Sequence, residues 1–218
     1  LEKILASRRI DESYNLAAQS SVGRSFEDPV TTFRTNLLGL VNLLEAIRSV
    51  SPATRCFQAA SSAMYGRLAD DPLSASNRFE PRSPYASSKL AAFWHAVNMR
   101  EAHGLYVCNG VAFNHESPRR PAEFVTQKIV LGAIAYRGWV RDGARDRPPV
   151  LELGNLDAVR DWGHARDTVR GMWLMLQQDE PRDYVLATGQ GHAVRDFVEL
   201  AYAHPAVDTA IRWTGEGT

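Results

Sequence analysis

The stretch FEPRSPYASSKLAAFWHAVNMREAHGLYVCNG, residues 79–110, predicts a helix followed directly by a buried strand. Ser83 and Pro84 are typical of a helix start, because serine accepts a backbone hydrogen bond at the N-cap and proline fits the first turn. The helix carries one apolar face, and the apolar run at 105–113 is typical of a strand covered on both sides. The apolar face consists of Leu90, Phe93, Trp94 and Val97.

The alternation of strand and helix continues on both sides of this stretch. Short apolar runs at 11–18, 55–60, 150–153 and 183–187 predict further strands, and residues 137–149, rich in Arg, Asp, Gly and Pro, predict an exposed loop. Four other segments carry apolar residues at helical spacing. These segments are marked by Leu37, Leu40, Val41, Leu44 and Ile47, by Val125, Ile129 and Ala133, by Val169, Met172, Trp173 and Leu176, and by Val194, Phe197, Val198 and Ala201.

The predicted fold class is α/β, because alternating strands and helices form a parallel sheet with helices on both faces. We expect part of a doubly wound sheet within residues 1–113. Residues 114–218 predict a smaller mixed part, interleaved with the last elements of the sheet. In such folds ligands bind outside the carboxyl ends of the strands. The residues that follow the predicted strands, among them Gln19, Ser61 and Asn114, are therefore the first candidates for a site.

The charge balance excludes several classes of protein. The chain has 218 residues with 25 Lys and Arg against 25 Asp and Glu, so its net charge is zero. It therefore lacks the positive charge of a nucleic-acid-binding domain or of a polybasic membrane anchor. Its apolar runs fall well short of the roughly 20 residues that a membrane span needs. Cys56 and Cys108 lie in strand-like runs, which is typical of buried, reduced thiols in a cytoplasmic protein.

Tyr85 and Lys89 are the first candidates for catalysis. Residues four apart lie on the same face of a helix, so the phenol and the ammonium group can approach each other. A nearby positive charge lowers the pKa of a tyrosine, which makes the phenol a usable general acid or base. Ser61 follows a predicted strand and can donate a hydrogen bond to the same substrate oxygen. The alternative is a surface tyrosine beside a solvated lysine, which an isolated Y-x-x-x-K pattern does not exclude.

Five stretches of the chain carry a resemblance to a known family. In their order and spacing they resemble extended short-chain dehydrogenase/reductases, and more closely the GDP-mannose 4,6-dehydratases, over nearly the whole chain. FNHESPRR and GNLDAVRDWGHA are typical of that family rather than of the fold. The stretches are YNLAAQSSVGRSFEDP (14–29), the opening stretch (79–110), FNHESPRR (113–120), LGNLDAVRDWGHARD (153–167) and MLQQDEPRDYVLATG (175–189).

The resemblance implies a Rossmann-like fold, an NADP cofactor and a set of catalytic residues. Tyr85 would be the catalytic tyrosine, and Ser61 takes the place of the family's hydroxyl residue. Lys89 would hold the nicotinamide ribose and lower the pKa of Tyr85. Residues 1–113 would be the C-terminal part of an NADP-binding domain. Further contacts with NADP are implied for Leu16, Ala17, Ala18, Gln19, Ser20, His115 and Arg120.

The resemblance also implies a GDP-sugar substrate, bound mostly by residues 114–218. Asn114, Lys128 and Arg160 match positions expected to hold it, mainly at the diphosphate, which suits basic side chains. The implied reaction converts GDP-mannose to GDP-4-keto-6-deoxymannose with internal NADP redox, as a step of deoxysugar synthesis. The resemblance further implies a cytoplasmic enzyme that forms a homo-oligomer when full length.

Several of these residues also have simpler explanations. Arg160 can pair with Asp161 or Asp167 at the surface, and His115 can be a neutral hydrogen-bonding histidine. Trp162 is more typical of a core position than of a stacking platform. Polar residues at 19 and 20 are also what normally ends a strand.

Ala63 departs from the family pattern. That pattern is Ser/Thr-x-Glu, in which the glutamate acts as the base, whereas QAASSAMYG places Ser61 at the hydroxyl and Ala63 at the glutamate. A general base contributes on the order of 10²- to 10⁴-fold in rate, so we expect little or no dehydration unless Glu116 substitutes. The alternatives are a GDP-hexose reductase or epimerase of the same superfamily, and a non-catalytic paralogue that binds a GDP-sugar or a partner protein.

The second departure is the lack of a G-x-x-G-x-x-G motif in these residues. In such folds this motif binds the pyrophosphate of the cofactor after the first strand. We therefore expect the strand at 11–18 to be the fourth of its sheet, and the family continues past Thr218. The prediction is a fragment truncated at both ends, without a signal peptide.

Overall fold

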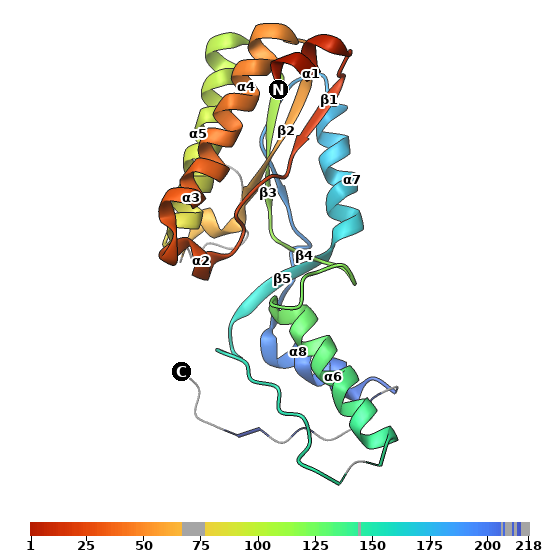
Figure 1. Ribbon diagram of the computed structural model, residues 1–218. Coiled ribbons are helices and arrows are strands. Elements are labelled where there is room, and N and C mark those ends of the chain that lie inside the picture. The colour runs from red at the N-terminus through yellow and green to blue at the C-terminus, as the bar shows by residue number, and fades with distance from the viewer. Residues whose placement is uncertain (67–76, 144, 206, 208–210, 212, 215–218) are drawn as a thin grey trace. The chain divides into compact units, whose positions relative to one another are not determined.

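The computed structural model describes residues 1–66, 77–143, 145–205, 207, 211, 213 and 214. The chain divides into two compact units, drawn in Figure 1. The first unit comprises Leu1–Phe113 and Arg166–Ala187, and the second comprises Asn114–Ala165 and Thr188–Thr218. The first unit is therefore built from two separate segments of the sequence.

A four-stranded parallel sheet forms the centre of the first unit, in the order β1-β2-β3-β6. Cys56 of β2 lies opposite Ser13 of β1 and Val107 of β3. Parallel neighbours need crossover connections, which helices supply here. The predicted α/β class is confirmed. The strands are β1 (Glu12–Asn15), β2 (Arg55–Ser61), β3 (Val107–Ala112) and β6 (Tyr184–Leu186).

One face of this sheet is covered by α4 (Gly39–Val50) and α5 (Pro84–His103), as Figure 1 shows. Cys56 and Val107 are buried in one cluster with apolar residues of both helices. The start of α5 is the predicted one: Ser83 caps the helix by accepting a hydrogen bond from a backbone N–H of the first turn. Local capping signals therefore place the helix that carries the Tyr–Lys pair.

The opposite face of the sheet is covered by α7 (Ala165–Leu176). Phe57 and Cys108 point to this side, because successive side chains of a strand alternate between faces, and they pack against Met172 and Leu176. Helices thus lie on both faces, as a doubly wound sheet requires. Both cysteines are free and buried, as predicted.

Short helical segments connect β1 to α4. Ser21 caps α2 and Asp28 caps α3, each by accepting a hydrogen bond from a backbone N–H. A single π-helical turn, η1, follows α3 and leads directly into α4. The short segments of the first unit are α1 (Glu2–Ser7), α2 (Val22–Glu27), α3 (Pro29–Phe33), η1 (Arg34–Leu38) and the 3-10 turn η2 (Ser62–Tyr65).

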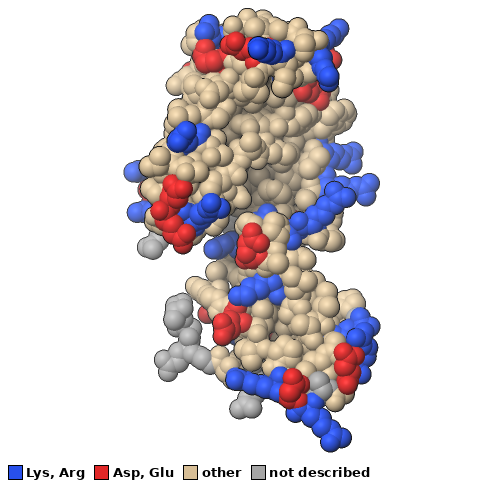
Figure 2. Space-filling model, in the orientation of Figure 1, with Lys and Arg blue, Asp and Glu red and all other residues tan. Residues whose placement is uncertain are grey.

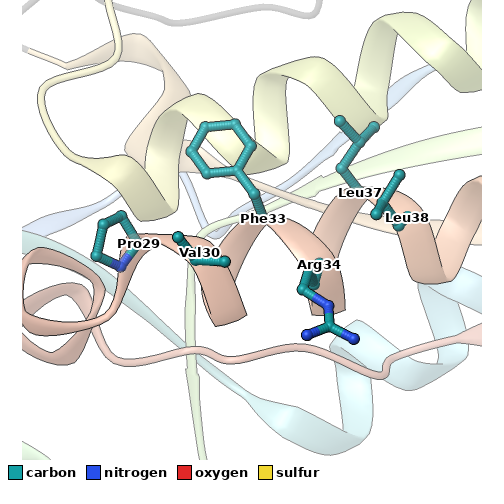
Figure 3. Close-up of a pocket in the computed structure, with 6 residues that line it drawn as sticks. All are labelled: Pro29, Val30, Phe33, Arg34, Leu37 and Leu38. Carbon is teal, nitrogen blue, oxygen red and sulfur yellow. The ribbon is translucent and has the colours of Figure 1, made fainter.

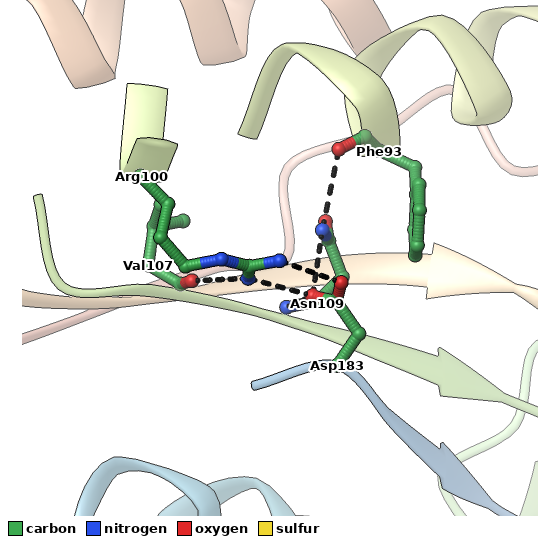
Figure 4. A network of polar contacts seen from close by, with 5 residues as sticks. All are labelled: Phe93, Arg100, Val107, Asn109 and Asp183. Carbon is green, nitrogen blue, oxygen red and sulfur yellow. Dashed lines mark hydrogen bonds and ion pairs between the residues drawn. The ribbon is translucent and has the colours of Figure 1, made fainter. Parts of the chain in front are cut away.

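An ion pair with little exposure ties the end of α5 to β3 and to the start of β6 (Figure 4). Arg100 donates to both carboxylate oxygens of Asp183, at 2.9 and 2.8 Å, and to the carbonyl of Val107 at 2.9 Å. Asn109 donates to Asp183 from its backbone and its side chain, both at 3.0 Å, and to the carbonyl of Phe93 at 3.2 Å. The hydrogen bonds to Asp183 raise the pKa of Arg100.

The second unit has a three-stranded sheet in the order β4-β5-β7 and two main helices. The β4–β5 pair is parallel and the β5–β7 pair is antiparallel. Ile129 of α6 packs with Val194 and Val198 of α8 in the core of this unit. The elements are β4 (Asn114–Glu116), α6 (Val125–Arg141), β5 (Val159–His164), β7 (Gly191–Ala193) and α8 (Val194–Ala203).

The structure corrects three predicted elements. Residues 150–153 are not a strand: Leu151 and Leu153 pack into the core of the second unit from an irregular segment. The predicted loop at 137–149 is helical up to Arg141, because α6 continues to that residue. The predicted strand at 11–18 is shorter, since β1 pairs with β2 only over Glu12–Asn15.

Trp94 is a fourth correction. It was predicted to lie on the buried face of α5, but it is 52% exposed, and its ring meets that of Phe93 edge to face at 5.6 Å. Leu90, Phe93 and Val97 do pack in the apolar cluster on this side. The apolar face of a helix can be wider than the surface that packs against the sheet, so a residue at the edge of that face remains exposed.

The surface carries charges of both signs. On the face seen in Figure 2, basic and acidic side chains occur on each unit, separated by broad uncharged areas. In the described part of the chain, no helix has the length and apolar character needed to cross a membrane.

Candidate active site

The carboxyl end of β2 positions Ser61, which ends that strand. Its side-chain oxygen accepts a hydrogen bond from the backbone N–H of Ala63 at 3.2 Å and thereby caps η2. Ala63 and Ser61 are both only partly buried, whereas the following Met64 and Tyr65 are buried. The buried side chains of Met64 and Tyr65 therefore anchor the turn after β2, while the side chains of Ser61 and Ala63 remain partly exposed.

Lys89 is the buried cation of the first unit's site. Its side chain is only 4% exposed, and its Nζ donates a hydrogen bond to the carbonyl of Ala59 at 2.9 Å. Burial lowers the pKa of Lys89 to about 8. The alternative of a solvated surface lysine is therefore wrong. Since Ala59 lies two residues before Ser61, Lys89 is anchored to the strand that also carries the serine.

Tyr85 lies one helical turn before Lys89 in α5, in the first turn, and is partly buried. A cation and a phenol on one helix face at this spacing can share a substrate or ribose oxygen. A lysine that loses its proton near pH 8 is also able to change charge within the working range of an enzyme. The local chemistry suits proton transfer at a hydroxyl group.

The segment after β1 holds the other sequence-predicted residues of this unit. Leu16, Ala17 and Ser20 are exposed, and Ala18 and Gln19 are partly buried. Their backbone leaves the sheet at the carboxyl end of β1, which is the edge where ligands bind in parallel folds. Leu16 is 55% exposed, so it offers an apolar surface at this edge.

Asn36 and Ser88 contact the candidate site and were missed by sequence reasoning. Asn36 bonds the backbone of Gln19 and the hydroxyl of Ser88, which lies next to Lys89 on α5. A signal was present in the sequence: Asn36 continues the buried stripe of Leu40 and Leu44 by one turn. A polar residue on a buried stripe needs partners, and that need marks it as a network position.

In the second unit, Asn114 and His115 lie on β4, opposite Trp162 and Gly163 of β5. Arg120 follows in the next loop and stacks over the ring of Phe124, with its guanidinium carbon 3.7 Å from the ring centroid. Asn114, His115 and Arg120 thus lie on β4 and in the loop that follows it.

Glu116 is held by two neighbours. One carboxylate oxygen accepts a hydrogen bond from Thr126 at 2.7 Å and lies 3.4 Å from Nε of Arg120. The side chain of Glu116 is only 17% exposed. A carboxylate engaged in this way serves the local structure, which argues against its use as a substitute base.

Lys128 and Arg160 are exposed cations on α6 and β5 of the second unit. Arg160 donates to the neighbouring carbonyl of Val159 at 2.7 Å. Asp161 accepts hydrogen bonds from Thr188 and from the backbone of Gly189, so its carboxylate is occupied by the loop before β7. Trp162 is partly buried and packs on the ring of Phe197 at 5.5 Å, in agreement with a core role.

The predicted site residues thus form two groups, one in each unit. The first group contains Ser61, Tyr85, Lys89 and the segment at 16–20. The second contains Asn114, His115 and Arg120, with Lys128 and Arg160 on neighbouring elements of the same unit.

Comparison with known proteins identifies the family to which the chain is similar. The family model described as GDP-mannose 4,6 dehydratase matches residues 1–218. GDP-mannose 4,6-dehydratase of Sinorhizobium fredii is 48% identical over 100% of this chain and 60% of its own length. GDP-mannose 4,6 dehydratase of Drosophila melanogaster is 45% identical over 100% of this chain and 53% of its own length. The chain therefore spans little more than half the length of these curated relatives.

Two solved structures show the same fold. RMD from Pseudomonas aeruginosa, complexed with NADPH, is 30% identical with a TM-score of 0.79, covering 90% of this chain and 66% of that one. UDP-glucose 4-epimerase from Thermotoga maritima, with UDP-glucose, has a TM-score of 0.83 at 22% identity, covering 96% and 65%.

The parallel sheet, its two helical layers and the Tyr–Lys pair of α5 define a Rossmann-like chain of the extended short-chain dehydrogenase/reductase class. Within that class, the chain belongs to the GDP-mannose 4,6-dehydratase family.

Proposed function

We propose that this chain is the sugar-binding and catalytic portion of a GDP-mannose 4,6-dehydratase-like enzyme. The observation that carries the proposal is Lys89, a buried cation bonded to Ala59 and placed one turn after Tyr85 in a chain of this family. Burying a charge is costly, and ionisable groups whose pKa is shifted by burial cluster at functional sites. The proposed activity is that of a protein as long as the relatives, of which this chain covers 60% and 53%.

Tyr85 takes the proton of the substrate's 4-hydroxyl as the C4–H bond breaks. A nicotinamide cofactor held by Lys89 and the segment at 16–20 would supply the hydride acceptor for C4 and the hydride donor for C6. Ser61 holds the same oxygen, and the charge of Lys89 favours the phenolate form of Tyr85. The resulting C4 ketone acidifies the C5 proton, and its loss to a base expels water from C6. Return of a proton to C5 completes GDP-4-keto-6-deoxymannose.

The residues of the first unit fit such a cofactor. The ammonium group of Lys89 has three donors, and the bond to Ala59 leaves donors for ribose hydroxyls. Leu16 provides exposed apolar surface at the edge of the sheet. We assign NADP rather than NAD, with further contacts from the segment at 16–20, His115 and Arg120. Arg120 is held beside Glu116 and over the ring of Phe124, which fixes its guanidinium group in place.

GDP-mannose or a related GDP-sugar is the proposed substrate, held by the second unit. Lys128 and Arg160 are exposed cations that suit a diphosphate, and Asn114 can bond a sugar or phosphate oxygen. Residues 1–113 would then bind the cofactor, and residues 114–218 would mostly bind the sugar nucleotide.

A reductase or epimerase of the same superfamily is the second candidate. Ala63 has no proton acceptor, and Glu116 is engaged by Thr126 and Arg120. Hydride transfer at C4 needs Tyr85 and Lys89 but not a base at position 63. These two observations favour redox chemistry without loss of water.

The test uses the gene product that contains residues 1–218, incubated with GDP-mannose and NADP and followed by mass spectrometry and NMR. A product that has lost one water identifies a dehydratase. A C4 epimer, or a 4-keto or reduced sugar that keeps the C6 oxygen, identifies the second candidate. Calorimetry that detects GDP-mannose but not NADP would contradict both and support a non-catalytic paralogue.

We further propose self-association into a homo-oligomer and a cytoplasmic location. An apolar groove along α3 and η1 supports the first proposal (Figure 3), since Val30 and Leu38 at its rim are 66% and 50% exposed. Leu38→Glu should lower the molar mass measured by sedimentation velocity, and an unchanged mass would contradict this role of the groove. The two buried free thiols suit a reducing compartment, which cell fractionation can check.

A further inference from the structure

The three-stranded sheet of the second unit places two of the predicted substrate residues on one of its faces. Asn114 of β4 lies opposite Trp162 of β5, and Arg160 lies two residues before Trp162 on the same strand. Residues paired across two strands, and residues two apart in one strand, project from the same face of a sheet. Asn114 and Arg160 therefore share a face, although they come from different strands.

His192 is the residue of β7 that belongs to this face. In the antiparallel β5–β7 pair it lies directly opposite Arg160. Side chains at such positions have Cβ atoms about 4.5–5.5 Å apart, so the imidazole and the guanidinium group are neighbours. Both residues are exposed. One small ligand can therefore contact both side chains.

The other face of β5 holds β7 in this register. The carboxylate of Asp161 accepts hydrogen bonds from Thr188 and Gly189 in the loop before β7, the shortest at 2.7 Å. Gly191 lies opposite Asp161, and an added Cβ there would come within 2.8 Å of the side chain of Val159. A larger residue than glycine would thus push β7 away from β5. The loop contacts and the glycine together keep the two strands, and so the two basic side chains, in place.

Both basic side chains keep hydrogen-bond donors for a ligand. A guanidinium group has five N–H donors, and in Arg160 only Nη1 is bonded, to the carbonyl of Val159 at 2.7 Å. An imidazole has at least one N–H donor in either protonation state. Among the residues that the structure describes, none forms a hydrogen bond or an ion pair with His192. The two side chains therefore offer several donors to an anion on this face.

We propose that His192 is a further substrate-binding residue, which donates a hydrogen bond to the diphosphate of the sugar nucleotide beside Arg160. The inference rests on the proposed function, in which Arg160 and Asn114 hold a GDP-sugar. A diphosphate offers oxygen acceptors on two adjacent phosphate groups, so two neighbouring donor side chains can bind it together. The imidazole then fixes the orientation of a group that Arg160 alone would hold from one side.

Three variants separate the imidazole from the strand that carries it. His192→Val removes the donor and keeps a residue that favours strands. His192→Lys restores a donor and a positive charge at the same place. His103→Val is the control, because it removes another exposed histidine, from the last turn of α5 in the first unit. The substituted side chains are exposed, so each variant should keep the thermal midpoint of the parent within about 2 °C.

The first measurement is calorimetric binding of GDP to the gene product that contains residues 1–218. His192→Val should weaken GDP binding about 10-fold, because one hydrogen bond to a charged group is lost. His192→Lys and His103→Val should stay within about 3-fold of the parent. An unchanged affinity in His192→Val, or a His192→Lys variant just as weak, would overturn the proposal. A loss seen with GDP-mannose but not with GDP would place the imidazole at the sugar and overturn it as well.

The second measurement follows the ring resonances of His192 by NMR in protein labelled at its histidines, with His192→Val identifying the signal. GDP should shift these resonances and leave those of His103 in place. Guanosine, which lacks both phosphates, should not shift them, and an equal shift with guanosine would assign the imidazole to the nucleoside and overturn the proposal. If the parent binds neither GDP nor GDP-mannose, the proposed function fails. If the parent binds GDP and His192 does not respond, only the role of His192 fails.

Discussion

The Nζ atom of Lys89 lies 2.9 Å from the carbonyl oxygen of Ala59, so the ammonium group is fixed against the end of β2. Burial lowers the pKa of this group to about 8, from 10.5 in an unfolded chain. Between these two values the unfolded chain binds more protons than the folded protein. The contribution of Lys89 to the free energy of unfolding therefore rises with pH across this window.

Lys89→Met should stabilise the protein at pH 7, because the charged group is disfavoured there by desolvation. The expected gain in the free energy of unfolding is on the order of 1–3 kcal/mol, after loss of the bond to Ala59 is subtracted. The gain should shrink as the pH rises from about 8 to 10.5. Urea unfolding at pH 7 and pH 10 measures both effects. Lys128→Met, which removes an exposed cation, is the control, and a destabilised Lys89→Met at pH 7 would contradict the burial argument.

Ala63→Glu should increase the formation of a 4-keto-6-deoxy product from GDP-mannose, because it supplies the missing proton acceptor next to the turn that Ser61 caps. The gain should be on the order of 10²-fold. Ala63→Gln has the same shape without the basic carboxylate and should remain at the parent level. Robust dehydration by the parent would show that the reaction does not need a base at this position.

Gly66→Ala should destabilise the first unit by about 3 kcal/mol or more. Gly66 has φ +69°, and an added Cβ would collide with the carbonyl of Glu80, whose own N–H bonds the carbonyl of Met64 at 2.9 Å. Gly104 also has a positive φ but open space around it, so Gly104→Ala should cost only about 1 kcal/mol. Thermal unfolding measures the loss of stability in both variants, and the difference between the two losses is the cost of the collision with Glu80. Equal losses would show that the contact with Glu80 relaxes freely.

Asp183→Ala should lower the free energy of unfolding by about 3 kcal/mol, since it removes the carboxylate that pairs with the charge of Arg100 and accepts from the backbone and side chain of Asn109. Glu180→Ala breaks the exposed pair with Arg182 and should change it by less than about 0.5 kcal/mol. Chemical denaturation provides both values. A small effect of Asp183→Ala would mean that water replaces the carboxylate.

The fold was predictable where its signals are local. Ser83 and Pro84 fixed the start of α5, and the continuous apolar run after it marked β3, which is buried along its whole length. The prediction of a strand at 150–153 was wrong because the leucines of this segment pack into the core without pairing to a strand. Strand pairing is not encoded locally. The three-residue β7 has no pattern of its own and exists through its pairing with β5.

The candidate site was predictable only in part, for a similar reason. The Tyr85–Lys89 spacing is a local feature, but the burial of Lys89 depends on Ala59, thirty residues earlier in the chain. Asn36 bonds Gln19, which lies 17 residues before it, and Ser88, which lies 52 residues after it. Residues that act through distant partners carry little trace of that role in the sequence.

The division of the chain has a consequence for how such proteins can be recombined. The second unit is encoded in two pieces, 114–165 and 188–218, with α7 and β6 of the first unit between them. Ile129 from one piece and Val198 from the other share a single core. A chimaera made with one crossover inside this region would combine halves of two different cores. Sugar preference in this family should therefore be exchangeable only by grafting both pieces together, while the intervening segment stays with its own sheet.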